Sequence, residues 1–408
     1  MNVLYVYGAF FDTHVFGING LMGMSTVQYA VCVVVTLGAA ALLGAVNPAI
    51  ALDGQAAAII AAAASWPVFF FLRTNLLNAD GNMLTPKFES DVPRLGAHLT
   101  HDELLELWVH SRIWHYTHQW WGWSVVFSYQ VLSCLAGSVF IYGMLRLAGR
   151  LSPARSWLFL AGALGGGYLQ LFFGDVENYT ITAALIVLFV LAAWRFLAGE
   201  SGLWLPTCVL ALAMCFHLET GWLLPSLLYL FAVSSSREGN THDVVKSAAA
   251  GAAIGVGTLF YFHFNGLPVW RFFSSHAGHA LRMNGVFAIG MPRTYYVEQL
   301  DLLLLLCPAV AMLVPLAIWH RERDEGTRFL AIAAGSMLLL QLVWKAQLGV
   351  FDDWNLYAIG GMLTGLFIWR GVTAAAQTAP ARITAAALAA TGWLHTSAWI
   401  LMNHRHGH

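Results

Sequence analysis

The chain of 408 residues is 59% hydrophobic and only 10% charged. A soluble globular protein carries about 25% charged residues, so this composition excludes an ordinary soluble domain and indicates a polytopic membrane protein. The formal net charge of −1 provides no basic surface, and nucleic acid is therefore not predicted as a partner. The five cysteines all fall in apolar segments and form no CxxC, which is typical of small buried side chains: Cys32, Cys134, Cys208, Cys215 and Cys307.

Apolar segments of about 20 residues can cross a bilayer as helices, and the sequence contains about twelve of them. They cover residues 27–46, 54–72, 124–146, 156–173, 179–198, 203–217, 219–234, 247–264, 299–319, 328–346, 355–369 and 383–402. The two segments that flank His217 are short, which leaves a broken helix or a re-entrant turn open. We predict an all-α fold in which residues 1–408 form a single membrane domain.

Basic residues in short loops indicate the orientation of the spans, because such loops stay cytoplasmic. They fall in every second connection, which places all of these loops on one side: Arg146, Arg150, Arg155, Arg195, Arg237, Lys246, Arg321, Arg323, Arg328, Arg370 and Arg382. Both termini and the two long loops, 73–123 and 265–298, then face outward. The candidate functional residues share that outer face: Asp80, Asp175, Glu177, Glu219, His276, His279, Asp352 and Asp353.

The stretch LFFGDVENYT, residues 171–180, places two carboxylates between long apolar segments. An ionised group at the centre of a membrane helix is unfavourable by about 2.5–3.5 kcal/mol on insertion scales. A membrane protein that keeps Asp175 and Glu177 beside Tyr179 at such a junction is therefore expected to use them. We predict a functional site here.

The first outward loop contains two signals. Asp80 and Gly81 form a turn signal just beyond the second span, where an acid is well placed to act as a base on a substrate from outside. Further on, Thr100 and Glu103 have the spacing of a capping box, and LTHDELLELWVHSRIWHYTHQWWGW predicts an amphipathic interfacial helix with a tryptophan belt. Such a helix can roof a cavity or simply anchor the protein at the interface.

Three other outward segments carry candidate binding residues. The second long loop offers cations and hydroxyls that suit an anionic headgroup, since arginine can bind phosphate oxygens in a bidentate fork. The late element WKAQLGVFDDWNLY combines acids with aromatic rings, a pairing that suits sugars, and His217 and Glu219 lie at the end of the sixth span. The candidates are Arg271, His276, His279, Arg282, Arg293, Lys345, Asp352, Asp353, Trp354, His217 and Glu219.

Histidine pairs with HxxH spacing occur at 98/101, 115/118 and 276/279, and residues three apart share a helix face. HExxH is absent and no cysteine lies nearby, so a metal site is not predicted from these pairs. Hydrogen bonding at the interface, or contact with a phosphate, explains them better. Use of a divalent metal remains open.

The stretches LGGGYLQLFFGDVENYTITAALIVL and LPTCVLALAMCFHLETGWLLPSLLYL resemble multispanning bacterial glycosyltransferases of the GT-C fold, including mannosyltransferase-like members that use polyprenyl-phosphate sugars. The order of landmarks is also similar. Asp80 follows an early span, a loop with Ser275, His276 and His279 comes later, and a DW-x-L-[FY]-A element begins at Asp353. The resemblance covers roughly residues 70 to 370.

The resemblance implies a reaction and a location. A sugar would move from a polyprenyl-phosphate or polyprenyl-diphosphate donor to a hydroxyl of a lipid, glycan or protein, with inversion, on the periplasmic face of the bacterial inner membrane. Asp80 would be the general base. The acids Asp175, Glu177 and Asp353 would orient the sugar or the acceptor. The leaving phosphate needs nearby cations, for which Arg271, Arg282, Arg293 and Lys345 are the candidates.

Two other functions remain open. A transporter or flippase would use intramembrane acids for ion coupling, but such proteins often show inverted repeats and midplane sites, whereas these acids share one face. A non-enzymatic subunit of a larger membrane complex would explain the histidines in or near spans as ligands of haem or a pigment, since imidazole is a common axial ligand: His217, His263 and His395.

Overall fold

The computed structural model describes residues 26–48, 54–75, 77, 81–82, 84–85, 88, 103–238, 241–266, 287–288, 290–313, 324–346, 348–350 and 352–405. Within these residues the fold is helical, and the β-type pairing present is an isolated bridge between Phe287 and Trp344. The long helices are α2 (Thr26–Val46), α3 (Gln55–Phe71), α5 (Leu104–Trp121), α6 (Val125–Leu151), α8 (Thr180–Leu197), α9 (Trp204–Phe216), α10 (Leu224–Glu238), α11 (Thr241–Phe264), α13 (Arg293–Leu306), α15 (Glu325–Val343), α16 (Ala358–Ala375) and α17 (Ala379–Arg405).

The predicted all-α membrane fold is confirmed, since a helix overlaps each predicted span. Five segments of the described chain are long and apolar enough to cross a membrane: Val125–Leu151, Thr180–Leu197, Thr241–Phe264, Glu325–Val343 and Trp354–Ala375. The span predicted at 156–173 is broken into α7 (Ser156–Ala163) and a short 3₁₀ helix, η3 (Gly167–Phe172). The segment around His217 is broken too, because η4 (Leu218–Leu223) separates α9 from α10.

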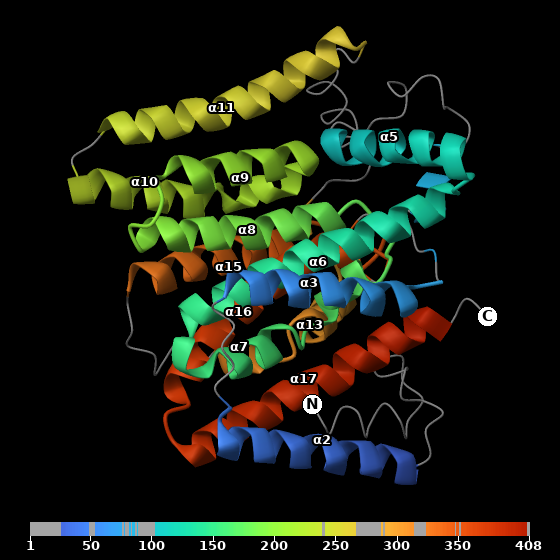
Figure 1. Cartoon of the computed structure of the whole chain (residues 1–408), viewed down its shortest axis with the longest axis vertical. Helices are drawn as coiled ribbons and strands as arrows, with labels where there is room; N and C mark the ends of the chain where they lie inside the picture. The colour runs from blue at the N-terminus through green and yellow to red at the C-terminus, as the bar shows by residue number, and fades with distance from the viewer. Residues whose placement is uncertain are drawn as a thin grey trace.

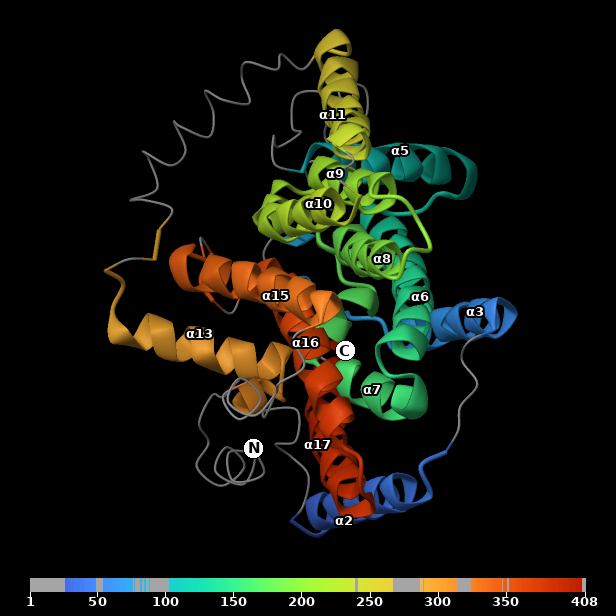
Figure 2. The ribbon, with the colours of Figure 1, turned by 90° about the vertical axis from the view of Figure 1, so that its left-hand side faces the viewer.

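The helices form an elongated stack with α11 at one extremity and α2 at the other (Figure 1). From the α11 edge the packing runs through α9, α8 and α6 to α3, while α17 joins α7 to α2 at the opposite edge. The view turned by 90° shows that α13 and α15 lie to one side of this stack (Figure 2). Helix α16 lies inside, with 83% of its span buried, whereas only 6% of the α11 span is buried.

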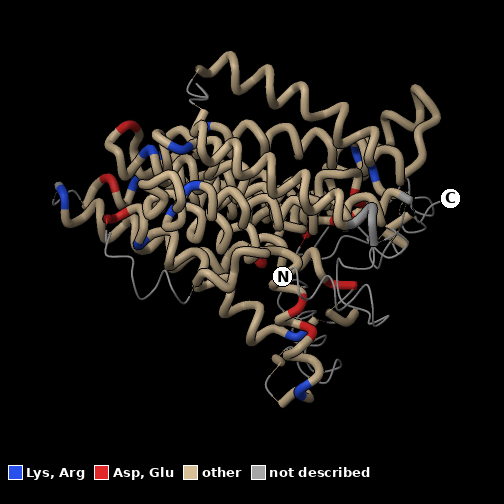
Figure 3. Tube along the Cα trace, turned by 90° about the horizontal axis from the view of Figure 1, so that it is seen from below, with Lys and Arg blue, Asp and Glu red and all other residues tan. Residues whose placement is uncertain are grey.

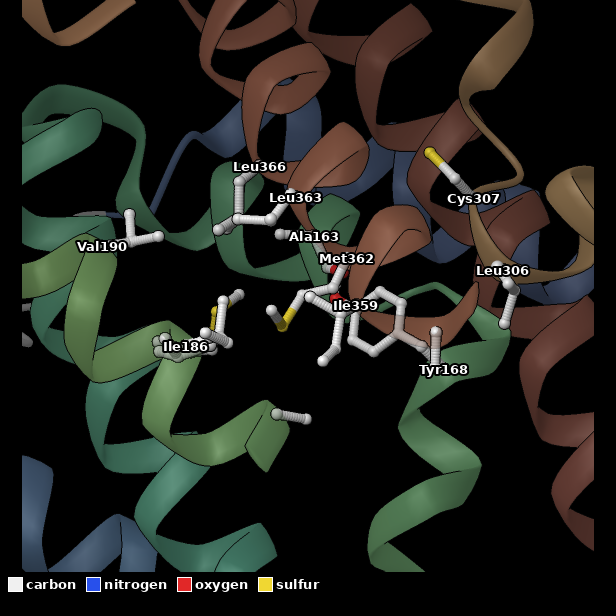
Figure 4. Close-up of a cluster of buried hydrophobic side chains, with 14 of the residues drawn as sticks. Ala163, Tyr168, Ile186, Val190, Leu306, Cys307, Ile359, Met362, Leu363 and Leu366 are labelled. Atoms are coloured by element: carbon white, nitrogen blue, oxygen red, sulfur yellow. Dashed lines mark hydrogen bonds between the residues drawn. The ribbon is translucent and has the colours of Figure 1, made fainter. Parts of the chain in front are cut away.

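The core lies where α8, α16 and the broken helix meet (Figure 4). Its apolar side chains include Tyr168, Ile186, Val190, Leu306, Ile359, Met362, Leu363 and Leu366. The Tyr168 hydroxyl donates to the carbonyl of Ala163, so the last turn of α7 is capped by a residue of η3. Small residues let backbones approach here: a Cβ on Gly167 would lie 2.7 Å from the Leu305 carbonyl oxygen.

The two GxxxG pairs confirm tight packing at one glycine each. A Cβ on Gly251 would lie 2.8 Å from the Thr207 methyl, so this glycine sets the approach of α11 to α9. Gly361 likewise faces the Leu306 side chain too closely for a Cβ. The second members differ, since Gly255 has nothing within 4 Å. Helix α11 is therefore packed at one turn and open at the next.

Most of the described lysine and arginine positions gather at one side of the molecule, across the direction in which the helices are stacked (Figure 3). Four arginines there each donate to a carbonyl in the last turns of another helix: Arg370 to Leu151, Arg237 to Leu197, Arg155 to Thr373 and Arg382 to Gly44. Cations at helix C-termini also interact favourably with the helix dipole. These contacts join loops that the sequence places on one side of the membrane. We call this region the basic end.

Candidate functional site

The acid stretch, residues 175–179, lies between η3 and α8 at the end opposite the basic end. The chain turns into it at Gly174, whose φ of +69° and whose missing Cβ are both required, because an added Cβ would lie 2.6 Å from the Arg73 Cβ. The backbone N–H of Thr74 donates to the Phe173 carbonyl at 2.7 Å, which ties this turn to the end of α3. The sequence therefore places two acids on a turn that other segments hold in place.

All five residues of the acid stretch are buried. Burial raises the pKa of the Asp175 carboxyl, and a hydrogen bond with the Val176 backbone opposes the rise. Its Oδ2 atom has no hydrogen-bond partner among the described residues. A buried carboxyl whose pKa is raised by desolvation is a candidate for binding or proton transfer.

Asn178 joins the acid stretch to α5. Its side-chain nitrogen donates to Glu103 Oε2 at 3.0 Å, and its Oδ1 accepts from the Tyr129 hydroxyl of α6 at 3.4 Å. Asn178 is 1% exposed, so these hydrogen bonds are made away from water. Both ends of the amide are thus engaged, which fixes the turn that leads into α8.

His217 joins the same carboxylate to the α9–α10 junction. Its Nδ1 accepts from the backbone N–H of Glu219 at 3.2 Å, so the ring proton resides on Nε2, which lies 3.4 Å from Glu103 Oε1. The ring packs on that of Tyr179, with centroids 4.6 Å apart. Glu103, Asn178, His217 and Glu219 form one group, which we call the polar cluster.

The buried face of α5 carries two ionisable side chains. Glu106 and His110, four residues apart, are both buried, and His110 Nδ1 lies 3.3 Å from Glu106 Oε1. The His110 ring stacks on Tyr129 with centroids 3.9 Å apart. Burial and the negative charge of Glu103 raise the pKa of Glu106, and burial lowers the pKa of His110 to about 4. Burial therefore favours the neutral form of both side chains.

An apolar cavity of about 520 Å³ adjoins the polar cluster between α9, α10 and α11. Ligand pockets commonly measure about 300–1,000 Å³. Two wall residues, Leu104 and Leu218, follow Glu103 and His217 directly in the chain. The remaining wall residues are mostly aliphatic or small, among them Leu210, Met214, Leu227, Phe231, Gly255 and Leu259.

The late acidic element forms its own turn. Asp353 Oδ2 accepts from the backbone N–H of Leu348 at 2.8 Å, while Asp352 is exposed. Trp354 is buried and packs edge-on against Trp399 of α17, 6.0 Å between centroids. Lys345 is half-buried, and Arg293 is exposed at the start of α13. The described contacts do not join this turn to the polar cluster, so their convergence stays a prediction.

Several predicted site residues lie outside the described residues: Asp80, Arg271, His276, His279 and Arg282. Gly81, which follows Asp80, is described, and its added Cβ would lie 3.1 Å from the Val176 carbonyl oxygen. The chain next to the predicted base therefore contacts the acid stretch.

The predicted amphipathic helix is present as α5, but it begins at Leu104 with Glu103 at the N-cap position and no side-chain cap. The expected capping box at Thr100 and Glu103 is therefore wrong in register, because the Glu103 carboxylate turns to Asn178 and His217 instead. Sequence reasoning missed Glu103, Glu106 and His110 as site residues. Their signal was polar side chains on the apolar stripe of an otherwise amphipathic helix.

The two alternative functions receive no specific support. His217 is engaged by two glutamates, and among the described residues no group of three or more histidine, cysteine or acidic side chains is arranged to hold a metal ion. The acid stretch and the η4 junction lie close together, because Asn178 and His217 both contact Glu103. The sequence predicted both segments on the same membrane face.

No protein-family model matches this sequence, and the comparison with curated proteins gives no match. The fold is similar to crystal structures of ArnT from Cupriavidus metallidurans. The apo structure aligns with a TM-score of 0.58 and 12% identity over 85% of this chain and 76% of ArnT. The structure bound to undecaprenyl phosphate aligns with the same score and identity over 86% and 77%. ArnT is a glycosyltransferase of the GT-C fold. The likeness therefore confirms the expected GT-C-like fold of a multi-pass membrane protein.

Proposed function

We propose that this protein is a membrane glycosyltransferase that takes a sugar from a polyprenyl-phosphate or polyprenyl-diphosphate donor. One observation carries the proposal: the chain changes from polar to apolar within one residue, at Glu103–Leu104 and again at His217–Leu218. A polar cluster whose residues are adjacent in the chain to the wall of an apolar cavity suits an amphiphile, because its sugar-bearing head and its hydrocarbon chain need different surroundings.

The fold supports the lipid-linked donor. One of the similar ArnT structures is bound to undecaprenyl phosphate, a lipid with a phosphate head and a long hydrocarbon chain. The aliphatic wall of the cavity provides no hydrogen-bonding groups beyond threonine hydroxyls and backbone, so it suits a polyprenyl chain better than a free sugar. We therefore propose that the cavity binds the polyprenyl chain of the donor.

The residues then take the following roles. An acceptor hydroxyl attacks the anomeric carbon, the bond from that carbon to the phosphate oxygen breaks, and Asp80 takes the hydroxyl proton. Buried Asp175 and Glu177 orient the sugar, as does Asp353. The phosphate leaves as an anion beside cations from the second outward loop and its neighbourhood, for which we propose Arg271, Arg282, Arg293 and Lys345, with His276 and His279 nearby.

The basic end provides the orientation. Loops rich in arginine remain cytoplasmic. Arg237 at the basic end donates to the last residue of α8, whereas the acid stretch precedes the first residue of α8, so the polar cluster lies at the opposite end of this helix. We therefore place the site on the periplasmic face of the bacterial inner membrane, where it would meet a lipid, glycan or protein acceptor.

The test fills the cavity at Gly255. Gly255 lines the cavity and a Cβ there meets nothing within 4 Å, so Gly255→Leu can place a side chain toward the cavity from an uncrowded backbone position. Gly257 lies two residues further along α11, also meets nothing within 4 Å, and does not line the cavity, so Gly257→Leu is the matched control. Both changes replace glycine by a stronger helix former.

Binding of undecaprenyl phosphate to the purified protein is measured first, then transfer from a panel of undecaprenyl-phosphate-linked sugars. We expect Gly255→Leu to weaken binding at least about tenfold, which corresponds to about 1.4 kcal/mol, while Gly257→Leu binds like the wild type. Asp80→Asn should keep binding and lose transfer. Equal binding by the two leucine variants would contradict the assignment of the cavity, and binding without any transfer by the wild type would favour a flippase.

A further inference from the structure

The Glu103 carboxylate contacts side chains from two segments that are distant in the sequence. Its Oε2 accepts from Asn178 and its Oε1 faces the Nε2 proton of His217, so one carboxylate links α5, the acid stretch and the α9–α10 junction. No other carboxylate among the described residues is shown with contacts to both. The Glu103 side chain is only 12% exposed, which leaves little water to replace either partner.

The consequence for the acid stretch follows from its geometry. Asn178 is directly preceded by Glu177 and lies three residues after Asp175, and both ends of its amide are used. Tyr179, the next residue, packs on the His217 ring that Glu103 also holds. The C-terminal side of the turn that presents the two acids is thus fixed through a residue outside it.

We propose that Glu103 is a positioning residue of the transferase: it holds Asn178 and His217 so that Asp175 and Glu177 keep the orientation needed for sugar transfer. The proposal rests on the proposed function. A displacement of about 1 Å at a reacting centre can lower a rate about 100-fold without abolishing substrate binding. Glu103 therefore acts on kcat and leaves the affinity for the lipid to the cavity.

The hydrogen-bond pattern allows a swap test. Glu103→Gln alone turns an amide N–H toward one of the two donors, and Asn178→Asp alone sets two carboxylates against each other. The two changes together restore every contact. The glutamine N–H donates to the aspartate, its Oε1 accepts from His217, and the aspartate still accepts from Tyr129.

Three quantities are measured for each variant: kcat and KM with the undecaprenyl-phosphate-linked sugar that the wild type uses best, the Kd for undecaprenyl phosphate, and hydrogen exchange of backbone amides 178–182. Each single variant should lower kcat about 10- to 100-fold, with KM and Kd within about threefold, and should speed exchange. The double variant should recover kcat to within about fivefold, because the two effects are coupled. Glu200→Gln, the same change at the basic end, is the control.

Wild-type kcat in the single variants, or a double variant as slow as either single one, would overturn the proposal. A single variant that loses folding is recognised by loss of undecaprenyl phosphate binding, and recovery in the double variant then decides. If the wild type transfers no sugar from any donor, the proposed function fails. Exchange still reports on Glu103 in that case, since unchanged protection in both single variants would show that it holds nothing.

Discussion

His110, on the buried face of α5, predicts that the docking equilibrium of this helix depends on pH. In the docked helix its pKa is lowered to about 4 by burial, whereas an undocked histidine titrates near 6.5. The docked state therefore binds fewer protons, so this residue contributes stability above pH 6.5 that is lost as the pH falls toward 4. From pH 7 to pH 5 the loss is about 2 kcal/mol, or about 30-fold in the docking equilibrium.

Glu106 contributes the opposite slope. Its pKa is raised by burial and by the charge of Glu103, so its stabilisation is complete below its ordinary value of 4.5 and is lost as the pH rises. The wild-type curve alone combines the two effects. We therefore compare the wild type with His110→Phe, which keeps a ring against Tyr129 and removes the titration.

The assay is hydrogen exchange of α5 amides at pH 5 and pH 7, corrected for the intrinsic exchange rate. Among the described helices, α5 packs mainly on α6 and α9, with a further ring contact to α11, so its opening can be measured from its own amides. The ratio of protection, wild type over His110→Phe, should fall about 30-fold from pH 7 to pH 5. With Glu106→Gln the corresponding ratio should instead fall as the pH rises. A ratio for His110→Phe that does not change with pH would refute the reasoning.

Two further predictions concern stability and are checked by the apparent Tm of the detergent-solubilised protein. Gly162→Ala should destabilise by about 1–3 kcal/mol, because the added Cβ overlaps the Trp369 indole, whereas Gly335→Ala has nothing within 4 Å and should be neutral or stabilising. Arg370→Met should cost about 1–3 kcal/mol, since this buried guanidinium loses charge-assisted hydrogen bonds at the basic end. The exposed Lys246→Met should leave the Tm unchanged; equal Tm values within either pair would contradict the packing described.

The membrane helices were predictable because each contains an apolar window of sufficient length, and α5 was predictable from its amphipathic pattern. The break between α7 and η3 was not predictable, because it depends on a contact with α13. The carbonyl of Leu305 in α13 lies where a side chain at Gly167 would be. Gly165, Gly166 and Gly167 permit this close approach, but only the folded chain shows which neighbour packs against them. Local composition therefore predicts the segments, and tertiary contacts decide where they break.

The candidate site was partly predictable for the same reason. Asp175, His217 and Glu219 attract attention as polar groups beside hydrocarbon, and the structure places His217 and Glu219 together. Glu103 looked like a helix cap, because its spacing from Thr100 fits that role equally well. Its partners Asn178 and His217 lie 75 and more residues away, and no local pattern indicates them.

The arginines of the basic end carry two kinds of information in the same atoms. During membrane insertion only their positive charge determines the orientation of the helices, and lysine would have the same effect. The folded protein uses the direction of their N–H groups, which fasten the ends of α2, α6, α8 and α16 to neighbouring helices. Arginine-to-lysine changes in these loops should therefore preserve the insertion topology while loosening the finished bundle, so that a correctly inserted protein is not necessarily a firmly assembled one.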